Sequence, residues 1–138
     1  MNLKWNTNML NSFYSVIKID ESFKKIFEQF GLPLNRTIEQ GFESLAKIII
    51  GQQISTNVAK SLSDKLKKDG MLNEKKISEA SIEKLKLYGL SSQKSSYLKN
   101  LATLTIKNEI DINSLNKLKS DEVTNLLIKI KGIGHWTI

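Results

Sequence analysis

Cysteine is absent from this chain of 138 residues, and proline and histidine each occur once. The lack of cysteine excludes disulfides, thiolate metal sites and cysteine nucleophiles, and it makes a reducing cytosol the natural setting. A single histidine, His135, excludes a histidine metal cluster and a histidine-based catalytic pair. Much of the familiar metal and nucleophile chemistry is therefore excluded before any motif is considered.

Long hydrophobic runs are missing as well. No apolar stretch approaches the roughly 20 residues that span a bilayer. Asn, Lys and Trp interrupt the N-terminus, where a signal peptide would have its apolar core. We therefore expect a cytoplasmic protein with no membrane partner. From the length we expect one domain over residues 1–138.

Arginine is scarce, yet the chain is basic. The formal net charge is +7, and Arg36 is the one arginine. A basic surface favours polyanions, and lysine suits phosphate contacts better than the bidentate reading of guanine. The alternative interpretation is compositional bias, because coding from AT-rich DNA also enriches lysine, asparagine and isoleucine.

The hydrophobic pattern predicts an all-α fold. No stretch alternates polar and apolar residues with period two, so no sheet is expected. About seven short helices joined by short loops should form the domain. Phe23, Phe27 and Phe30 share one helix face, which indicates core packing rather than a platform for stacked bases. The clearest predicted helices cover residues 21–30 after the N-cap Asp20, 41–51, 56–68, 82–88, 92–107 and a last one from Asp121.

The final stretch, Asp121–Ile138, carries the most specific pattern. An apolar helix face (Val123, Leu126, Leu127 and Ile130) follows Ser120, which is the predicted N-cap. Lys131-Gly132-Ile133-Gly134 comes next and can turn tightly. If His135-Trp136-Thr137 opens a second helix, the N–H groups of both segments can face one phosphate. A plain helix C-cap is the alternative.

No pair of acids is placed for general acid/base work, so spacing alone favours a helical nucleic-acid-binding domain.

Three groups of residues resemble a known family. They are Phe42-Glu43-Ser44-Leu45 followed by Ile50-Gly51-Gln52-Gln53-Ile54-Ser55; Gly89-Leu90-Ser91 followed by Lys94 and Tyr97-Leu98; and Leu127–Gly134 followed by Trp136-Thr137. Together they resemble the signature of the DNA-3-methyladenine glycosylase II family, which belongs to the helix-hairpin-helix DNA glycosylases. The resemblance runs from about Asp20 to Ile138, with the motifs in the family's order and at about its spacing.

The resemblance implies base excision from double-stranded DNA that contains alkylated bases. Such enzymes flip the damaged base out of the duplex and hydrolyse its N-glycosidic bond. It implies a phosphate grip by the hairpin amides, a wedge at Gln53 that fills the gap left by the base, and a base pocket at Trp136. The alternatives are a solvated loop residue for Gln53 and core packing for Trp136. The DNA-binding residues expected from the resemblance are Gln53, Ser55, Lys131, Gly132, Ile133 and Gly134.

The resemblance requires no cofactor, although family members often hold a monovalent cation on hairpin carbonyls. Here a structural Na⁺ or K⁺ would be bound by the backbone carbonyls of Ile128, Ile130 and Ile133. We also expect a monomer, associated with the nucleoid if the source is bacterial.

Two departures from the family pattern matter. His135 stands where the family commonly has proline. The family's catalytic aspartate lies one helix and a loop beyond the tryptophan, and no carboxylate follows Glu122 here. We therefore expect the larger, N-terminal part of an alkylated-base glycosylase, truncated within the hairpin motif and inactive alone. The alternatives are a non-catalytic helix-hairpin-helix DNA-binding module and a decayed coding sequence without function.

Overall fold

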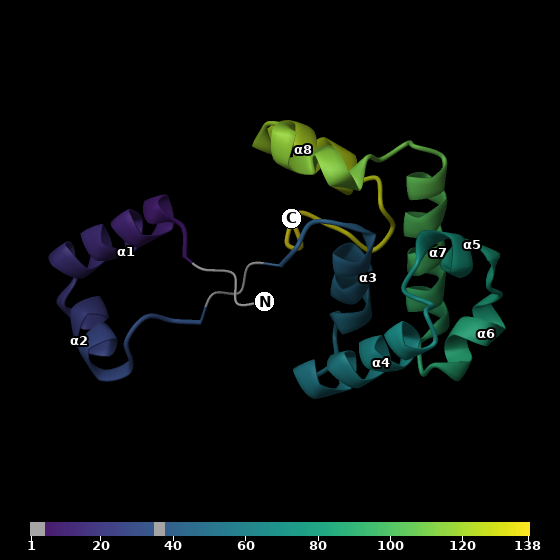
Figure 1. The fold of residues 1–138 in the computed structure, drawn as a ribbon, viewed down its shortest axis with the longest axis horizontal. Helices are drawn as coiled ribbons and strands as arrows, with labels where there is room; N and C mark the ends of the chain where they lie inside the picture. The colour runs from purple at the N-terminus through teal and green to yellow at the C-terminus, as the bar shows by residue number, and fades with distance from the viewer. Residues whose placement is uncertain (1–4, 35–37) are drawn as a thin grey trace. The chain divides into compact units, whose positions relative to one another are not determined.

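The computed structural model describes residues 5–34 and 38–138, and within these ranges it is helical, without strands. The described residues form two compact units, Met1–Ile38 and Glu39–Ile138. The single domain over 1–138 stays a prediction, and each unit is described by itself below. Figure 1 shows the helices, whose bounds are α1 Thr7–Ile19, α2 Glu21–Phe30, α3 Phe42–Gly51, α4 Thr56–Lys68, α5 Glu74–Glu79, α6 Ile82–Leu87, α7 Ser92–Ile106, the 3-10 helix η1 Ile112–Lys117 and α8 Ser120–Leu127.

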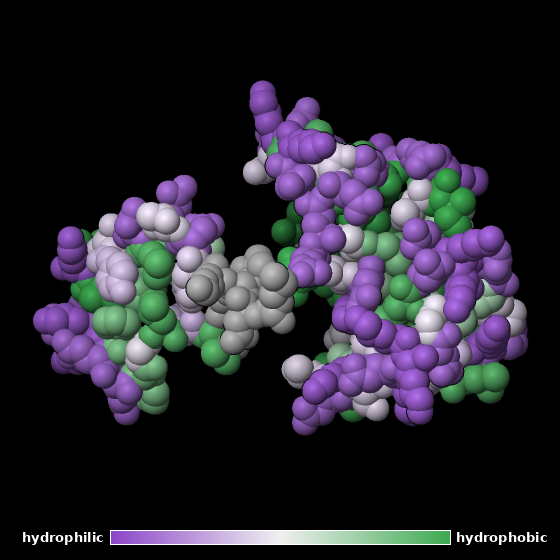
Figure 2. Space-filling view, viewed as in Figure 1, coloured by the Kyte–Doolittle hydropathy of each residue, from purple (hydrophilic) through white to green (hydrophobic). Residues whose placement is uncertain are grey.

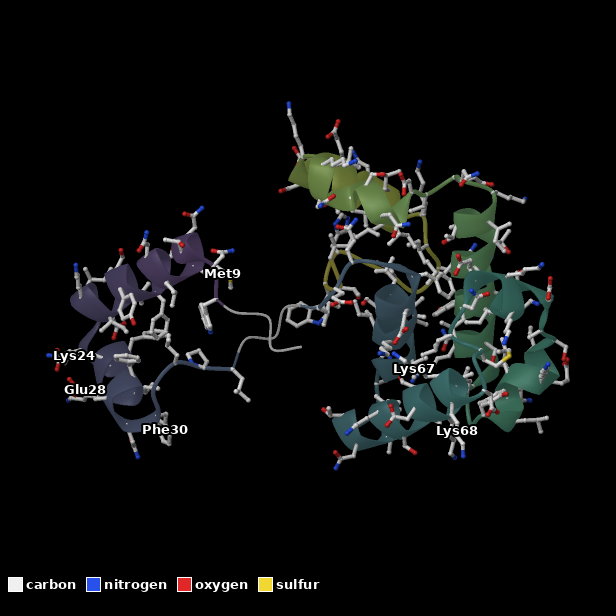
Figure 3. All side chains as sticks on the ribbon, in the orientation of Figure 1. Met9, Lys24, Glu28, Phe30, Lys67 and Lys68 are labelled. Atoms are coloured by element: carbon white, nitrogen blue, oxygen red, sulfur yellow. The ribbon has the colours of Figure 1, made fainter. Side chains whose placement is uncertain are left out.

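The first unit is a pair of helices, α1 and α2. Asp20 begins α2 as predicted, because its carboxylate accepts the N–H groups of Ser22 and Phe23. Phe27 packs edge-on against two aromatic rings of α1. The rest of the predicted core face is exposed, with Phe30 at 72%. Figure 2 shows hydrophobic residues on the surface of this unit, and Figure 3 labels Phe30 at the end of α2. The prediction of core packing is therefore confirmed for Phe27 and wrong for Phe23 and Phe30 within the unit, because two helices offer no third element to cover the rest of the face.

The second unit contains the hydrophobic core. Helix α7 contacts α3, α5 and α6, while α3 also contacts α4. Helix α3 is apolar nearly all round, which is typical of a central helix, and its residues Ala46, Ile49 and Ile50 are fully buried. The remaining core residues come from all later elements of the unit: Leu66, Met71, Ile77, Ala80, Leu85, Leu90, Leu98, Leu101, Ala102, Ile110, Ile112, Leu127, Ile130 and Ile133.

Side-chain caps set most helix starts in this unit. The hydroxyls of Ser55, Ser81 and Ser91 each accept an N–H from the first turn. The sequence predicts the cap at Ser81, and it leaves open Ser55 or Thr56 and Ser91 or Ser92 for the other two. The predicted N-cap Ser120 is wrong. Lys119 occupies that position, and its N–H donates to the Glu122 carboxylate at 2.8 Å, so the acidic first turn itself begins α8.

One short helix, α5, was missed by the sequence pattern. It has a single buried side chain, Ile77, and six residues are too few to show a hydrophobic period. Its signal lies in Asn73, which accepts the N–H groups of Lys75 and Lys76. In the described residues, no helix has the length and apolar character that crossing a bilayer requires.

Ion pairing around Glu43 gives a testable pH dependence. Hydrogen bonds from Lys47 (2.6 Å) and Lys67 (2.8 Å) lower the pKa of the Glu43 carboxyl below its ordinary 4.5. Figure 3 labels Lys67 on α4, beside α3. Glu43→Gln should lower the free energy of unfolding by less than about 1 kcal/mol at pH 7, because the pair is exposed and screened. A lowered carboxyl pKa stabilises the fold above pH 4.5, and this contribution is lost as the pH falls through the folded-state pKa.

Urea denaturation of wild type and Glu43→Gln at pH 7 and pH 3 checks this expectation, with Glu79→Gln as the control. Glu79 is exposed and forms no ion pair within the described ranges. An equal difference between wild type and Glu43→Gln at both pH values would contradict the assignment.

Candidate nucleic-acid interface

An open hollow of about 450 Å³ lies where three segments of the second unit meet. The loop after α3, the first turns of α7 and the stretch after α8 all contribute to it. These are the segments that carry the three sequence motifs, so the fold brings the motifs together. The hollow is lined by Gln52, Gln53, Gln93, Lys94, Tyr97, Gly132, Trp136 and Thr137.

Two hydrogen bonds anchor the chain just before Gln53, at the end of α3 and at the start of the loop that follows it. The Lys94 ammonium donates to the Ile50 carbonyl at 2.6 Å, and burial lowers the pKa of Lys94 below its ordinary value. The Gln52 side-chain amide donates to the Gly132 carbonyl, also at 2.6 Å. Directly after these anchors, Gln53 has a φ of 57° and an exposed side chain. A non-glycine residue in this left-handed region is held there by its surroundings, which is common at functional loops.

Position 132 requires a glycine because of its backbone conformation and its contact with Tyr97. Its φ is +86°, and a Cβ placed there would lie 2.2 Å from Cδ2 of Tyr97. Gly134 differs, because its φ is not positive and an added Cβ would meet nothing within 4 Å. Contacts within the described chain therefore explain the first glycine of the hairpin and leave the second unexplained.

The backbone N–H groups of the hairpin alternate between paired and unpaired. The Lys131 N–H donates to the Asn100 side chain at 2.8 Å, and the Ile133 N–H donates to the Ile130 carbonyl at 3.0 Å. Among the residues that the structure describes, the N–H groups of Gly132 and Gly134 have no hydrogen-bond partner. These two N–H groups are the ones expected to hold a phosphate.

The other predicted site residues lie in different surroundings. Trp136 lines the hollow and is fully exposed, so the alternative of core packing is excluded within the described residues. Ser55 caps α4 through its hydroxyl and does not line the hollow. Ile133 is buried, while the Lys131 side chain is exposed. Residues 134–137 form a single turn in which the Thr137 N–H donates to the Gly134 carbonyl at 2.8 Å, rather than a second helix.

The three carbonyls assigned to a monovalent cation belong to the turns that follow α8. The Ile130 carbonyl accepts the Ile133 N–H and keeps one lone pair for a cation. In residues 5–34 and 38–138 no group of acidic, histidine or cysteine side chains could hold a metal. The cation at Ile128, Ile130 and Ile133 stays a prediction.

Sequence reasoning gave no role to Gln52, Asn100 or the Lys94 side chain. Each makes a hydrogen bond to a backbone group at least 31 residues away. Lys94 and Gln52 belong to the motifs that resemble the family, but the motifs do not show what their side chains bind. Only the fold shows that their partners are the last turn of α3 and the hairpin.

A helix followed by a tight turn with two unpaired amides, beside a polar hollow, corresponds to the first helix and the hairpin of a helix-hairpin-helix motif. Residues 46–131 match the family described as HhH-GPD superfamily base excision DNA repair protein. The chain belongs to this family.

Similar proteins agree with that assignment. The chain is 27% identical over 128 residues to DNA-3-methyladenine glycosylase 1 of Schizosaccharomyces pombe, covering 87% of the chain and 56% of the relative. A solved structure of the S. pombe 3-methyladenine DNA glycosylase in complex with abasic DNA has a TM-score of 0.82 at 25% identity, covering 92% of the chain and 66% of that structure. The structure of the 3-methyladenine DNA glycosylase of Archaeoglobus fulgidus has a TM-score of 0.74 at 27% identity, covering 96% of the chain and 48% of that structure. The chain thus spans about half to two thirds of the length of these relatives.

Proposed function

We propose that this chain supplies the duplex-gripping part of a base-excision DNA glycosylase that removes alkylated bases of the 3-methyladenine type. The observation that carries the proposal is the pair of unpaired N–H groups at Gly132 and Gly134. A phosphate oxygen accepts such N–H groups readily, and a glycine without a Cβ lets the backbone approach it closely. The relatives' names and the net charge of +7 support the same partner.

The hollow suits a base removed from the stack. Trp136 offers an exposed indole face at its edge, and an electron-rich ring attracts a positively charged alkylated purine. Gln53 is exposed on a fixed loop at the same hollow, where it can fill the gap that the base leaves. Base flipping costs unstacking free energy, and a residue that occupies the gap offsets part of that cost.

Catalysis requires a group that the hollow does not contain. Cleavage of the glycosidic bond develops positive charge on the sugar, which a carboxylate stabilises. None of the residues that line the hollow in the described chain is an aspartate or glutamate. The proposed role of these 138 residues is therefore to bind and position DNA.

The proposal predicts salt-dependent binding. Duplex DNA should bind without sequence preference, and its affinity should fall roughly 40- to 150-fold between 50 and 200 mM salt if about three or four phosphates are contacted. Fluorescence anisotropy of a labelled duplex, titrated at both salt concentrations, measures this directly. Absence of binding at 50 mM salt, or an affinity that does not change with salt, would refute the proposed function.

A further inference from the structure

We propose that Gln52 is a positioning residue that couples the hairpin to the wedge loop, so that a phosphate grip and insertion of Gln53 occur together. The inference rests on the proposed function and extends it from the two contact sites to the link between them. Its basis is one hydrogen bond, 2.6 Å long, from the Gln52 amide to the Gly132 carbonyl, which joins residues 80 positions apart.

The bond connects the two sites through a single residue at each end. Gly132 presents an unpaired N–H on one side of its Cα and accepts from Gln52 through its carbonyl on the other. Gln52 is half-buried and directly precedes Gln53. Any shift of the hairpin against a phosphate is therefore transmitted to the backbone of the wedge loop.

The wedge loop, which is the loop after α3 that carries Gln52 and Gln53, needs this support because Gln53 has an unfavourable backbone conformation. A residue with φ near 57° is stable only when its neighbours restrain it. Lys94 restrains the Ile50 side of the loop, and Gln52 restrains it at the position adjoining Gln53. Without the Gln52 bond, the loop relaxes and Gln53 no longer projects in a fixed direction, which lowers its ability to enter a base gap.

The test compares a neutral variant of similar length with a matched control. Gln52→Met removes the amide donor and keeps the side-chain length. Gln40→Met removes another glutamine amide that donates to a distant carbonyl of the same unit, that of Ile112, and that does not line the hollow. Both variants lose the same kind of hydrogen bond, so thermal denaturation should show similar losses of stability for the two.

The measurement is the affinity of the 138-residue chain for two duplexes, one intact and one containing a tetrahydrofuran abasic analogue beside 2-aminopurine. Wild type should prefer the abasic duplex and change the 2-aminopurine fluorescence as the gap is filled. Gln52→Met should bind the intact duplex like wild type. Its preference for the abasic duplex over the intact one should fall by at least about fivefold, the factor that corresponds to one neutral hydrogen bond. Gln40→Met should keep both the preference and the fluorescence change.

The outcomes separate the inference from the proposed function. Wild type that binds neither duplex refutes the proposed function itself. Wild type that binds both duplexes equally, Gln52→Met that keeps the preference, or Gln40→Met that loses it as well would each overturn the coupling by Gln52. Should Gln52→Met fail to fold, Gln52→Asn serves in its place, because its shorter amide cannot span the 2.6 Å contact.

Discussion

Replacing Gly132 with alanine should destabilise the second unit by about 2–4 kcal/mol and abolish DNA binding. An L residue in the left-handed region costs about 1 kcal/mol or more, and overpacking typically costs a further 1–3 kcal/mol. The clash is with the Tyr97 ring, whose Cδ2 would lie 2.2 Å from the new Cβ. For a unit of this size the melting temperature should fall by about 10–20 °C, measurable by circular dichroism.

Gly134→Ala is the matched control, because it adds the same methyl group two residues away. No atom lies within 4 Å of that Cβ, and φ is not positive, so the melting temperature should stay within error of wild type. Its affinity for duplex DNA should nevertheless fall, since the methyl group holds the phosphate away from the N–H. Wild-type stability of Gly132→Ala would refute the steric role of Tyr97. Wild-type affinity of Gly134→Ala would mean that the hairpin does not contact phosphate.

The second large effect concerns base release, which the 138-residue chain should not catalyse above background on alkylated DNA. The residues that line its hollow include no carboxylate that could stabilise an oxocarbenium-like sugar. Chromatography of the bases freed from methylated DNA gives a direct measurement. Robust release of 3-methyladenine would contradict the proposal and would assign the chemistry to one of the acids elsewhere in the chain.

A fusion provides the positive control for that experiment. The region of the S. pombe relative that follows its matched residues can be joined after Ile138, and excision should then appear. By the family resemblance, this added region carries the catalytic aspartate. Changing it to asparagine should lower excision at least about 10²-fold while duplex binding stays unchanged. Excision that survives this change would show that the aspartate is not the stabilising group.

Much of the local structure could be predicted from the sequence. Asp20 and Ser81 begin their helices as expected, because a cap depends only on the three residues that follow it. The buried face of α3 also follows from its apolar spacing. The motifs around the hollow were recognisable for the same reason, since each is a short continuous stretch.

Which faces meet could not be predicted in this way. The stripe with Phe23 and Phe30 has core spacing, yet it is exposed in a unit of two helices. The spacing of a sequence reports the geometry of one helix, whereas burial depends on what packs against it.

The sequence by itself determined an all-helical, basic chain with a glycine turn after its last helix and a polar loop after its central one. The tertiary structure alone decided that Gln52 reaches Gly132, that Tyr97 requires a glycine there, and that Asn100 occupies the Lys131 N–H while the N–H groups of Gly132 and Gly134 stay unpaired. The physical reason is the sequence separation over which each interaction acts. Caps and periodicity act over three or four residues, whereas each of these contacts joins segments 31 or more residues apart, which only the packing of α3, α7 and the hairpin brings together.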